Sequence, residues 1–298
     1  MNFAVTGGAG FIGSHLTKYL VSEGHNVTVI DNLFRGKLSN LEEVKDEINF
    51  LKLDILDFEN LKKALQNMDG IFHQAALASV PESYEKEEEY KKVNITGTEN
   101  IFKIASEFKI KVVYASSSAV YGNIEKIPIT EDFDLKPINP YGVTKLEDEY
   151  LAKTYSKSGT EIIALRYFNV FGIGQSLGYA GVITKFLEKI KEGKNPIIFG
   201  DGSQVRDFIF VRDIVKANVA AMQSNVEHGF FNIGTGNSIS LNELASLMIK
   251  ISGKPLQVQY NDPLDGDIKL SKADISLATR TFDWKPQTPF EEGLRTLF

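Results

Sequence analysis

Two side chains in "NPYGVTK" (Asn139–Lys145) have the types and spacing needed for proton chemistry. Tyr141 and Lys145 are four residues apart, so on a helix both lie on one face. Tyrosine has an unperturbed pKa of about 10 and is a poor base near neutral pH, but a nearby ammonium favours its phenolate. The pair therefore predicts a tyrosine that takes a proton from a hydroxyl, although the same spacing is common on helix surfaces.

A run of three serines in "YASSSAVYG" (Tyr114–Gly122) comes after an apolar stretch that predicts a buried strand. Serine runs are typical of loops, so the run alone is weak evidence for chemistry. Beside a tyrosine base, a serine hydroxyl could hydrogen-bond to the reacting oxygen and assist the proton transfer. The residue types do not decide among Ser116, Ser117 and Ser118.

The stretch "TGGAGFIGSHL" places Gly7, Gly10 and Gly13 after one predicted strand and at the start of a helix. A dinucleotide pyrophosphate approaches the backbone closely there, and its charge is met by the helix N-terminus. Side chains at these positions would block the approach. Three glycines also make a plain turn, so the prediction needs support from residues further along the chain.

Two carboxylates at suitable strand ends give this support. Asp31 ends the second predicted strand, about 20 residues after the glycines, where a carboxylate binds both adenosine ribose hydroxyls. Such a carboxylate repels a 2′-phosphate, so NAD is favoured over NADP. Asp54 and Ile55, at the end of the third strand, would flank the adenine.

Strands and helices that alternate along the chain must position these residues. This alternation predicts parallel βαβ units and an α/β fold with a doubly wound, Rossmann-type sheet. The predicted strands are Asn2–Thr6, Asn26–Asp31, Ile48–Asp54, Gly70–Ala76, Ile110–Ser116 and Glu161–Phe168. The predicted helices in this half include Phe58–Asn67, Glu87–Phe108 and Tyr141–Ser158.

The regular alternation of strands and helices ends after about Gly172, where glycines and short mixed elements dominate. We expect residues 1–172 to form the dinucleotide-binding domain and residues 173–298 a smaller, mixed α/β substrate lobe. An alternative is that Val211–Ile233 returns to the first domain. Because ligands of such sheets bind at the carboxyl ends of the strands, the predicted site residues should meet on one rim. His73, also on that rim, is predicted to be structural.

Composition narrows the functional class. The 298 residues carry a formal net charge of −6, which argues against a nucleic-acid partner, and the absence of cysteine excludes disulfides and thiolate metal sites. We predict no metal site. No apolar run reaches the roughly 18 residues of a membrane helix, and the first residues do not form a signal peptide. We therefore expect a cytoplasmic protein without a membrane partner.

Taken together, the motifs resemble those of extended short-chain dehydrogenases/reductases, in the NAD-dependent epimerase/dehydratase family. The subgroup is UDP-glucose 4-epimerase-like, and the similarity covers essentially the whole chain. The motifs that carry it are "TGGAGFIG", "DNL", "LDILD", "HQAA", "VNITGT", "SSSAVYG", "NPYGVTK", "RYFNVFG", "GDGSQVRDFIFVRD", "FNIGTG" and "DGDIKLSKADI".

The resemblance implies NAD as cofactor and a catalytic set of Ser117, Tyr141 and Lys145. Ser118 remains the alternative hydroxyl, because register in a serine run is easily misjudged, and Ser116 would lie nearer the cofactor. The residues that the resemblance assigns to the cofactor are Gly7, Gly10, Phe11, Ile12, Gly13, Asp31, Asn32, Asp54, Ile55, Gln74, Ala75, Ala76, Asn94, Ser116, Tyr141, Lys145 and Tyr167.

The resemblance also implies a nucleotide-sugar substrate, a UDP-hexose. Asn169 and Arg206 match residues that bind the diphosphate, Asp267 a carboxylate near the nucleoside ribose, and Val182 and Phe199 the base pocket. The full predicted substrate set is Ser79, Ser117, Ser118, Asn169, Val182, Phe199, Arg206, Asp267 and Ser271.

Departures from the family pattern bear on the reaction. Family dehydratases and decarboxylases carry an acid between the catalytic hydroxyl and "YG", whereas Ser118–Val120 offers none, which favours oxidation and re-reduction at one carbon. Leu264 stands where the family often has a diphosphate-binding arginine. Ser271 leaves room for a 2-acetamido group, so UDP-glucose, UDP-galactose and their N-acetyl forms are all predicted substrates.

Three alternatives stay open: an NAD-dependent epimerase of another nucleotide sugar, an NAD-dependent reductase, and a non-catalytic NAD-sensing protein on the same fold. A sensor needs the glycines and Asp31 but not the hydroxyl–tyrosine–lysine set. The family commonly forms homodimers through two helices per subunit. We expect the same here through Glu89–Phe108 and Tyr141–Ser158.

Overall fold

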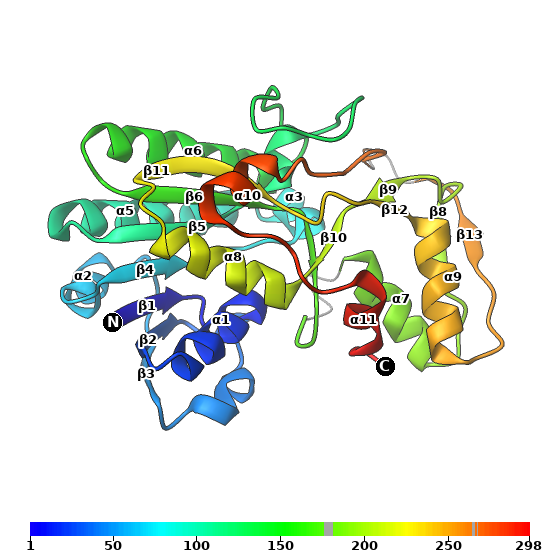
Figure 1. Cartoon of the computed structure of the whole chain (residues 1–298), viewed down its shortest axis with the longest axis horizontal. Coiled ribbons are helices and arrows are strands. Elements are labelled where there is room, and N and C mark those ends of the chain that lie inside the picture. Colours follow the sequence, from blue (N-terminus) through cyan, green and yellow to red (C-terminus); the bar gives the residue numbers. More distant parts are fainter. Residues whose placement is uncertain (176–180, 264–265, 267) are drawn as a thin grey trace.

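The computed structural model, which describes residues 1–175, 181–263, 266 and 268–298, has a seven-stranded parallel β-sheet at its centre (Figure 1). Its strands are β1 (Asn2–Thr6), β2 (Asn26–Asp31), β3 (Ile48–Lys52), β4 (Gly70–His73), β5 (Lys111–Ser117), β6 (Ile162–Tyr167) and β11 (His228–Ile233). Their order across the sheet is β11-β6-β5-β4-β1-β2-β3.

This strand order makes the sheet doubly wound, and the predicted Rossmann-type fold is confirmed. The order reverses between β1 and β4, whose residues Thr6 and His73 are direct neighbours, and a crevice forms at such a reversal. The six predicted strands are present. The seventh, β11, pairs with β6 along its whole length, with His228 opposite Ile162 and Ile233 opposite Tyr167.

Both faces of the sheet are buried, as expected for parallel strands. Successive residues of one strand pack into different cores: Val5 lies in the core shared with one layer of helices, and Ala4 in the core shared with the other layer. The helices of the first layer are α1 (Phe11–Ser22), α8 (Val211–Gln223) and α10 (Ser276–Phe282). Those of the second layer are α2 (Phe58–Leu65), α5 (Gly97–Phe108) and α6 (Pro140–Lys157).

The helix predicted over Glu87–Phe108 is divided in the structure. A short helix α4 (Glu87–Tyr90) continues into a π-helical segment η2 (Lys91–Thr96), which runs into α5. Wider turns of this kind are frequent at functional sites. Other short elements near the sheet rim are η1 (Leu38–Val44), α3 (Val80–Glu85) and η3 (Ser118–Tyr121).

The C-terminal part forms a smaller mixed α/β unit with its own apolar core, including Phe186 of α7, Leu244 of α9 and Leu294 of α11. Two short strands tie this unit to the sheet rim, since β10 pairs in parallel with β7 directly after β6. The helices are α7 (Val182–Lys191), α9 (Leu241–Ser252) and α11 (Phe290–Arg295). The strands are β7 (Asn169–Phe171), β8 (Ile197–Phe199), β9 (Val205–Arg206), β10 (Phe208–Phe210), β12 (Ile239–Ser240) and β13 (Gln259–Asn261).

Within the described ranges, no helix combines the length and the hydropathy that a membrane span requires.

Candidate active site

A cavity of about 1270 Å³ lies where the sheet rim meets the C-terminal unit. Its walls come from the loops after β1, β2, β3, β4, β5 and β6 and from the start of α7. The carboxyl ends of the parallel strands therefore converge on one space, as expected for a ligand site on a doubly wound sheet.

The glycine-rich loop forms the wall beside α1. Gly7 has φ +65°, and a Cβ there would lie 2.7 Å from the amide nitrogen of Ala75. A Cβ on Gly13 would collide with the carbonyl of Gly7, so the loop closes only with glycine at both places. Gly10 precedes α1 and no side chain caps the helix. Among the described residues, no side chain therefore accepts from the first-turn amides of α1, and Phe11, Ile12 and Gly13 lie at the cavity wall.

Asp31 links the end of β2 to that loop. Its buried carboxylate accepts hydrogen bonds from the amides of Ala9 (3.0 Å) and Leu33 (2.8 Å) and lines the cavity. Burial raises the pKa of Asp31, and the two amides oppose this. Beyond it, Asp54 accepts a 2.9 Å hydrogen bond from Asn32, also on the cavity wall.

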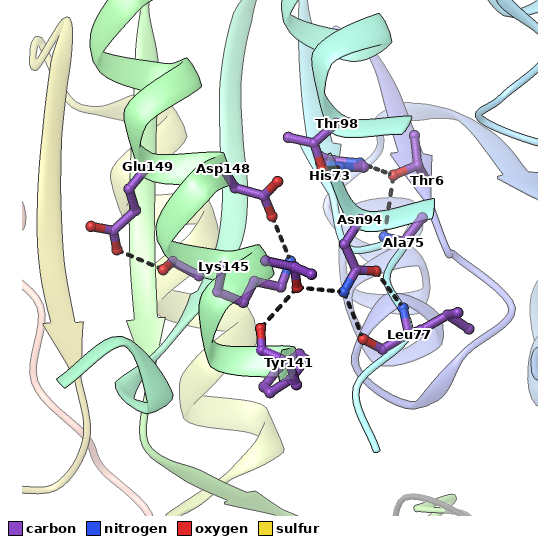
Figure 2. Close-up of polar contacts among 12 residues, drawn as sticks. Thr6, His73, Ala75, Leu77, Asn94, Thr98, Tyr141, Lys145, Asp148 and Glu149 are labelled. Carbon is purple, nitrogen blue, oxygen red and sulfur yellow. Dashed lines mark hydrogen bonds and ion pairs between the residues drawn. The ribbon is translucent and has the colours of Figure 1, made fainter. Parts of the chain in front are cut away.

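Helix α6 begins beside the opposite wall and carries the predicted tyrosine and lysine. Asn139 caps it by accepting a 2.8 Å hydrogen bond from the amide of Gly142, which fixes the first turn. Tyr141 and Lys145 both line the cavity. The Lys145 side chain is nearly fully buried, and its Nζ lies 3.1 Å from Oδ2 of Asp148 (Figure 2).

The three serines at the end of β5 occupy different environments. Ser116 donates a 2.7 Å hydrogen bond to Oε1 of Glu149, so its proton is engaged inside the fold. Ser117 lines the cavity, and its Oγ accepts a 3.1 Å hydrogen bond from the amide of Ala119, which leaves its own proton for a ligand. Ser118 starts η3 and is not part of the cavity wall.

A family model described as the NAD dependent epimerase/dehydratase family matches residues 3–234. The chain belongs to this family. The glycine loop, the acidic strand end and the Tyr–Lys pair of α6 line one cavity. Their roles in NAD-dependent chemistry stay predictions.

Relatives in this family align over nearly the whole chain. The putative UDP-glucose 4-epimerase of Methanocaldococcus jannaschii is 37% identical over 296 residues, which is 98% of this chain and 95% of the relative. A UDP-glucose 4-epimerase of Thermotoga maritima, solved with UDP-glucose, is similar with a TM-score of 0.95, 36% identity and coverage of 100% and 97%. A UDP-N-acetylglucosamine 4-epimerase of Methanobrevibacter ruminantium, solved with UDP-N-acetylmuramic acid, gives a TM-score of 0.95, 40% identity and coverage of 99% and 96%.

NAD is the cofactor of the family, and the residues of this chain fit it. The uncapped amides of α1 supply donors for a pyrophosphate, and the glycine loop leaves room for its close approach. The predicted cofactor residues that line the cavity are Gly7, Gly10, Phe11, Ile12, Gly13, Asp31, Asn32, Asp54, Ile55, Gln74, Ala75, Ala76, Ser116, Tyr141, Lys145 and Tyr167.

One predicted cofactor residue, Asn94 of η2, is not on the cavity wall. Its fully buried amide accepts from the Leu77 amide (2.8 Å) and donates to the Leu77 carbonyl (2.9 Å) and to Oγ1 of Thr144 (2.9 Å; Figure 2). Asn94 therefore connects the π-helical segment to the loop after β4 and to α6, next to Lys145. Its direct contact with NAD stays a prediction.

The predicted substrate residues divide into two groups. Ser79, Ser117, Asn169 and Val182 line the cavity. Ser118, Phe199, Arg206 and Ser271 do not, and Asp267, like Leu264, lies outside the described residues.

Two of the residues off the cavity wall are neighbours in space. Ser271 is buried, and its amide donates a 3.1 Å hydrogen bond to the carbonyl of Val205, directly before Arg206. Arg206 and Ser271 therefore lie on adjacent segments of the C-terminal unit. If one of them contacts the substrate, the other lies close to the substrate as well. Their substrate contacts stay predictions.

Sequence reasoning missed Asn218 of α8, a residue that shapes the site. Its Nδ2 donates a 2.7 Å hydrogen bond to Oη of Tyr167, and Gln74 Nε2 donates to its Oδ1 at 3.1 Å. These contacts fix Tyr167 in the wall, and burial raises the pKa of this phenol far above neutrality. Asn218 stands in no motif, and only the packing of α8 under β6 brings it here.

His73 is structural in the described fold, as predicted. Its ring lies between Oγ1 of Thr6 (2.6 Å) and Oγ1 of Thr98 (2.9 Å), fully inside the protein (Figure 2). Burial, with a smaller effect of Lys145, lowers the pKa of His73 to about 3. The ring therefore stays neutral near physiological pH and holds β1, β4 and α5 together.

Proposed function

We propose that this protein is an NAD-dependent nucleotide-sugar 4-epimerase that interconverts UDP-glucose and UDP-galactose and accepts the N-acetyl forms. The observation that carries the proposal is that Ser117, Tyr141 and Lys145 line the same cavity as the glycine loop. The residues after Ser117 bring no carboxylate into that cavity, because Ser118–Val120 are serine, alanine and valine. Without such an acid, elimination of water is disfavoured and chemistry at one carbon is favoured.

Tyr141 takes the proton of the sugar 4-hydroxyl and later returns it. The buried ammonium of Lys145, on the same face of α6, favours the phenolate and would hold the nicotinamide ribose. Ser117 donates a hydrogen bond through its hydroxyl to the reacting oxygen and keeps its proton. NAD, when bound at the glycine loop, would supply the hydride-transfer chemistry at that carbon.

Epimerisation requires the 4-keto sugar to present its other face before re-reduction. Firm anchoring of the diphosphate with a loosely held hexose satisfies this requirement. Asn169 is suited to the anchoring, since its side chain lines the cavity and is oriented by a 3.0 Å hydrogen bond from Nδ2 to the Asp207 carbonyl. We assign Arg206 to the same diphosphate, whose two charges suit a guanidinium.

The N-acetyl forms are included for two reasons. Ser271 is small, so a neighbouring sugar pocket gains room for a 2-acetamido group. The relative with 40% identity is named as a UDP-N-acetylglucosamine 4-epimerase, and another with 36% identity was solved with UDP-glucose. Both substrate classes are therefore assigned to this chain.

The test is direct. Purified protein without added NAD is incubated with UDP-galactose and, separately, with UDP-N-acetylgalactosamine, and the products are followed by proton NMR. The expected result is conversion to the gluco epimers, and its loss in Tyr141→Phe by about 10²- to 10⁴-fold. Stoichiometric consumption or release of NADH would indicate a reductase instead. No conversion by the unmodified protein, together with equal NAD binding in Tyr141→Phe, would indicate a non-catalytic NAD sensor.

We further propose a homodimer through α5 and α6. Two large side chains of α6 support this, because Val143 and Tyr150 are 40% and 49% exposed although they are apolar or aromatic. Light scattering should give twice the chain mass, and Tyr150→Glu should give a monomer. A monomer in the unmodified protein would overturn this assignment.

A further inference from the structure

Lys145 has a counter-ion inside the protein. Asp148 lies one turn further along α6, and its Oδ2 is 3.1 Å from Nζ of Lys145 (Figure 2). The Lys145 side chain is 3% exposed and that of Asp148 is 0% exposed. Because water does not screen this contact, the charge of Asp148 acts on Lys145 far more strongly than a surface carboxylate would.

Asp148 has few other partners. Among the described residues, its Oδ1 accepts no hydrogen bond. Burial is the largest effect on this carboxyl and raises its pKa to about 7. Lys145 and a hydrogen bond with the Thr98 side chain oppose the increase, and Glu149 adds to it. Burial therefore favours the protonated form of Asp148, and Lys145 favours its ionised form.

The other titratable groups around Asp148 are either paired with an opposite charge or kept neutral by burial. Glu149 of the same helix is paired with Arg166 of β6. On β5, burial raises the pKa of Tyr114 well above its usual value, and on β4 burial keeps the pKa of His73 low and its ring neutral. Of these described neighbours, Asp148 is the group whose ionisation changes the net charge next to Lys145.

We propose that Asp148 is a positioning residue that holds the Lys145 ammonium and sets the net charge which that ammonium presents to Tyr141. This inference rests on the proposed function, in which Tyr141 exchanges the substrate proton. We expect an unopposed Lys145 ammonium to favour the phenolate of Tyr141, and an ionised Asp148 to offset part of that effect.

The offset suits a reversible reaction. In one half of an epimerisation Tyr141 must act as a base, and in the other half as an acid. Both roles are served when the pKa of the phenol lies near the working pH, and a fully unopposed ammonium would make Tyr141 a weaker base. Asp148 thus tunes the proton exchange without touching the substrate.

The test measures the phenol of Tyr141 rather than turnover. Phenolate absorbance is titrated against pH in the NAD-loaded protein, and the titration of Tyr141→Phe is subtracted to isolate Tyr141. In Asp148→Asn the midpoint should fall by about one pH unit, since Lys145 is no longer offset. Asp148→Glu, which keeps the charge, should restore most of the unmodified midpoint.

Asp213→Asn is the matched control. Asp213 of α8 is also buried, but its carboxylate accepts hydrogen bonds from the amides of Gln287 and Thr288 and lies away from the cavity wall. The titration midpoint of the Tyr141 phenol in Asp213→Asn should therefore equal that in the unmodified protein. Should Asp148→Asn fail to fold, Asp148→Leu removes the same charge and supplies the comparison. An unchanged Tyr141 midpoint in a folded Asp148→Asn or Asp148→Leu variant would overturn the proposal. A fall of the midpoint in Asp148→Glu as large as in the neutral variant would also overturn it. The titration needs no substrate, so its outcome can be distinguished from a failure of the protein to epimerise UDP-sugars.

Discussion

Arg166 and Glu149 form a bidentate ion pair inside the fold, with Nε to Oε1 at 2.8 Å and Nη2 to Oε2 at 2.7 Å. Oε1 of Glu149 also accepts the Ser116 hydroxyl at 2.7 Å. On the other side, Nη1 of Arg166 donates to Oη of Tyr121 at 2.7 Å, and Tyr121 donates to Asn232 at 2.7 Å. These contacts join the end of β5 to α6, β6 and β11, next to the serine run.

Glu149→Gln should destabilise the protein strongly. The change leaves the guanidinium of Arg166, which is 3% exposed, without a charged partner, and such losses cost about 3–5 kcal/mol. Urea unfolding followed by circular dichroism measures the difference. Glu291→Gln removes the exposed partner of Arg295 and should leave the unfolding curve unchanged. Equal effects of the two changes would contradict the account.

Ser117→Ala should reduce kcat for 4-epimerisation by about 10- to 1000-fold, because it removes the free hydroxyl on the cavity wall. Ser118→Ala should have little effect, since Ser118 starts η3 and is not on that wall. Initial rates with a single UDP-sugar compare the two variants under equal NAD loading. The opposite order of effects would move the catalytic role to Ser118.

Asp31→Asn should weaken NAD binding by about ten-fold or more and reduce the preference for NAD over NADP. The amide can still accept one of the backbone hydrogen bonds now made to Asp31 but loses the charge that pairs with ribose hydroxyls and repels a 2′-phosphate. Titration calorimetry on cofactor-free protein measures both affinities. Asp57→Asn is the control, because Asp57 caps α2 and lies off the cavity wall. An unaltered cofactor preference would count against the role of Asp31.

Stability should fall on acidification partly because of His73. Burial lowers its pKa from 6.5 to about 3, so between these values the unfolded chain binds a proton that the folded chain does not. Unfolding free energy therefore rises with pH across this window. In His73→Gln this contribution is absent. Urea unfolding measured between pH 6.5 and pH 4 should then give an unfolding free energy that depends less steeply on pH, by the equivalent of about one proton. If the unfolding free energies of the unmodified protein and of His73→Gln depended on pH equally, His73 would not be held neutral in the fold.

Much of the architecture can be predicted from local sequence signals. The glycine loop, the acid at Asp31 and the Tyr141–Lys145 pair each depend on spacing within one strand–loop–helix unit, so short-range rules are enough to predict them. Strand ends are harder to predict. The strands expected over Ile48–Asp54 and Gly70–Ala76 end earlier in the structure, because their last residues turn into the cavity wall.

Features made by packing between distant segments could not be predicted. The side chain of Asn94 is adjacent to Leu77 and Thr144 only because η2, the β4 loop and α6 meet. Asn218 is 51 residues from Tyr167 in the chain and meets it through the position of α8. The sequence around Asp148 suggests a solvent-exposed helix position, since "KLEDE" is mostly charged, yet the structure buries this residue completely.

The central claim is that the hydride leaves and returns at one carbon of the sugar. UDP-galactose carrying deuterium at C4 is converted in ordinary water, and the product is examined by mass spectrometry and NMR. The account predicts UDP-glucose that retains the deuterium at C4, with Tyr141→Phe giving almost no product. Epimerised product whose C4 deuterium has been replaced by solvent hydrogen would contradict it, because the carbon would then have exchanged a proton with water rather than a hydride with NAD.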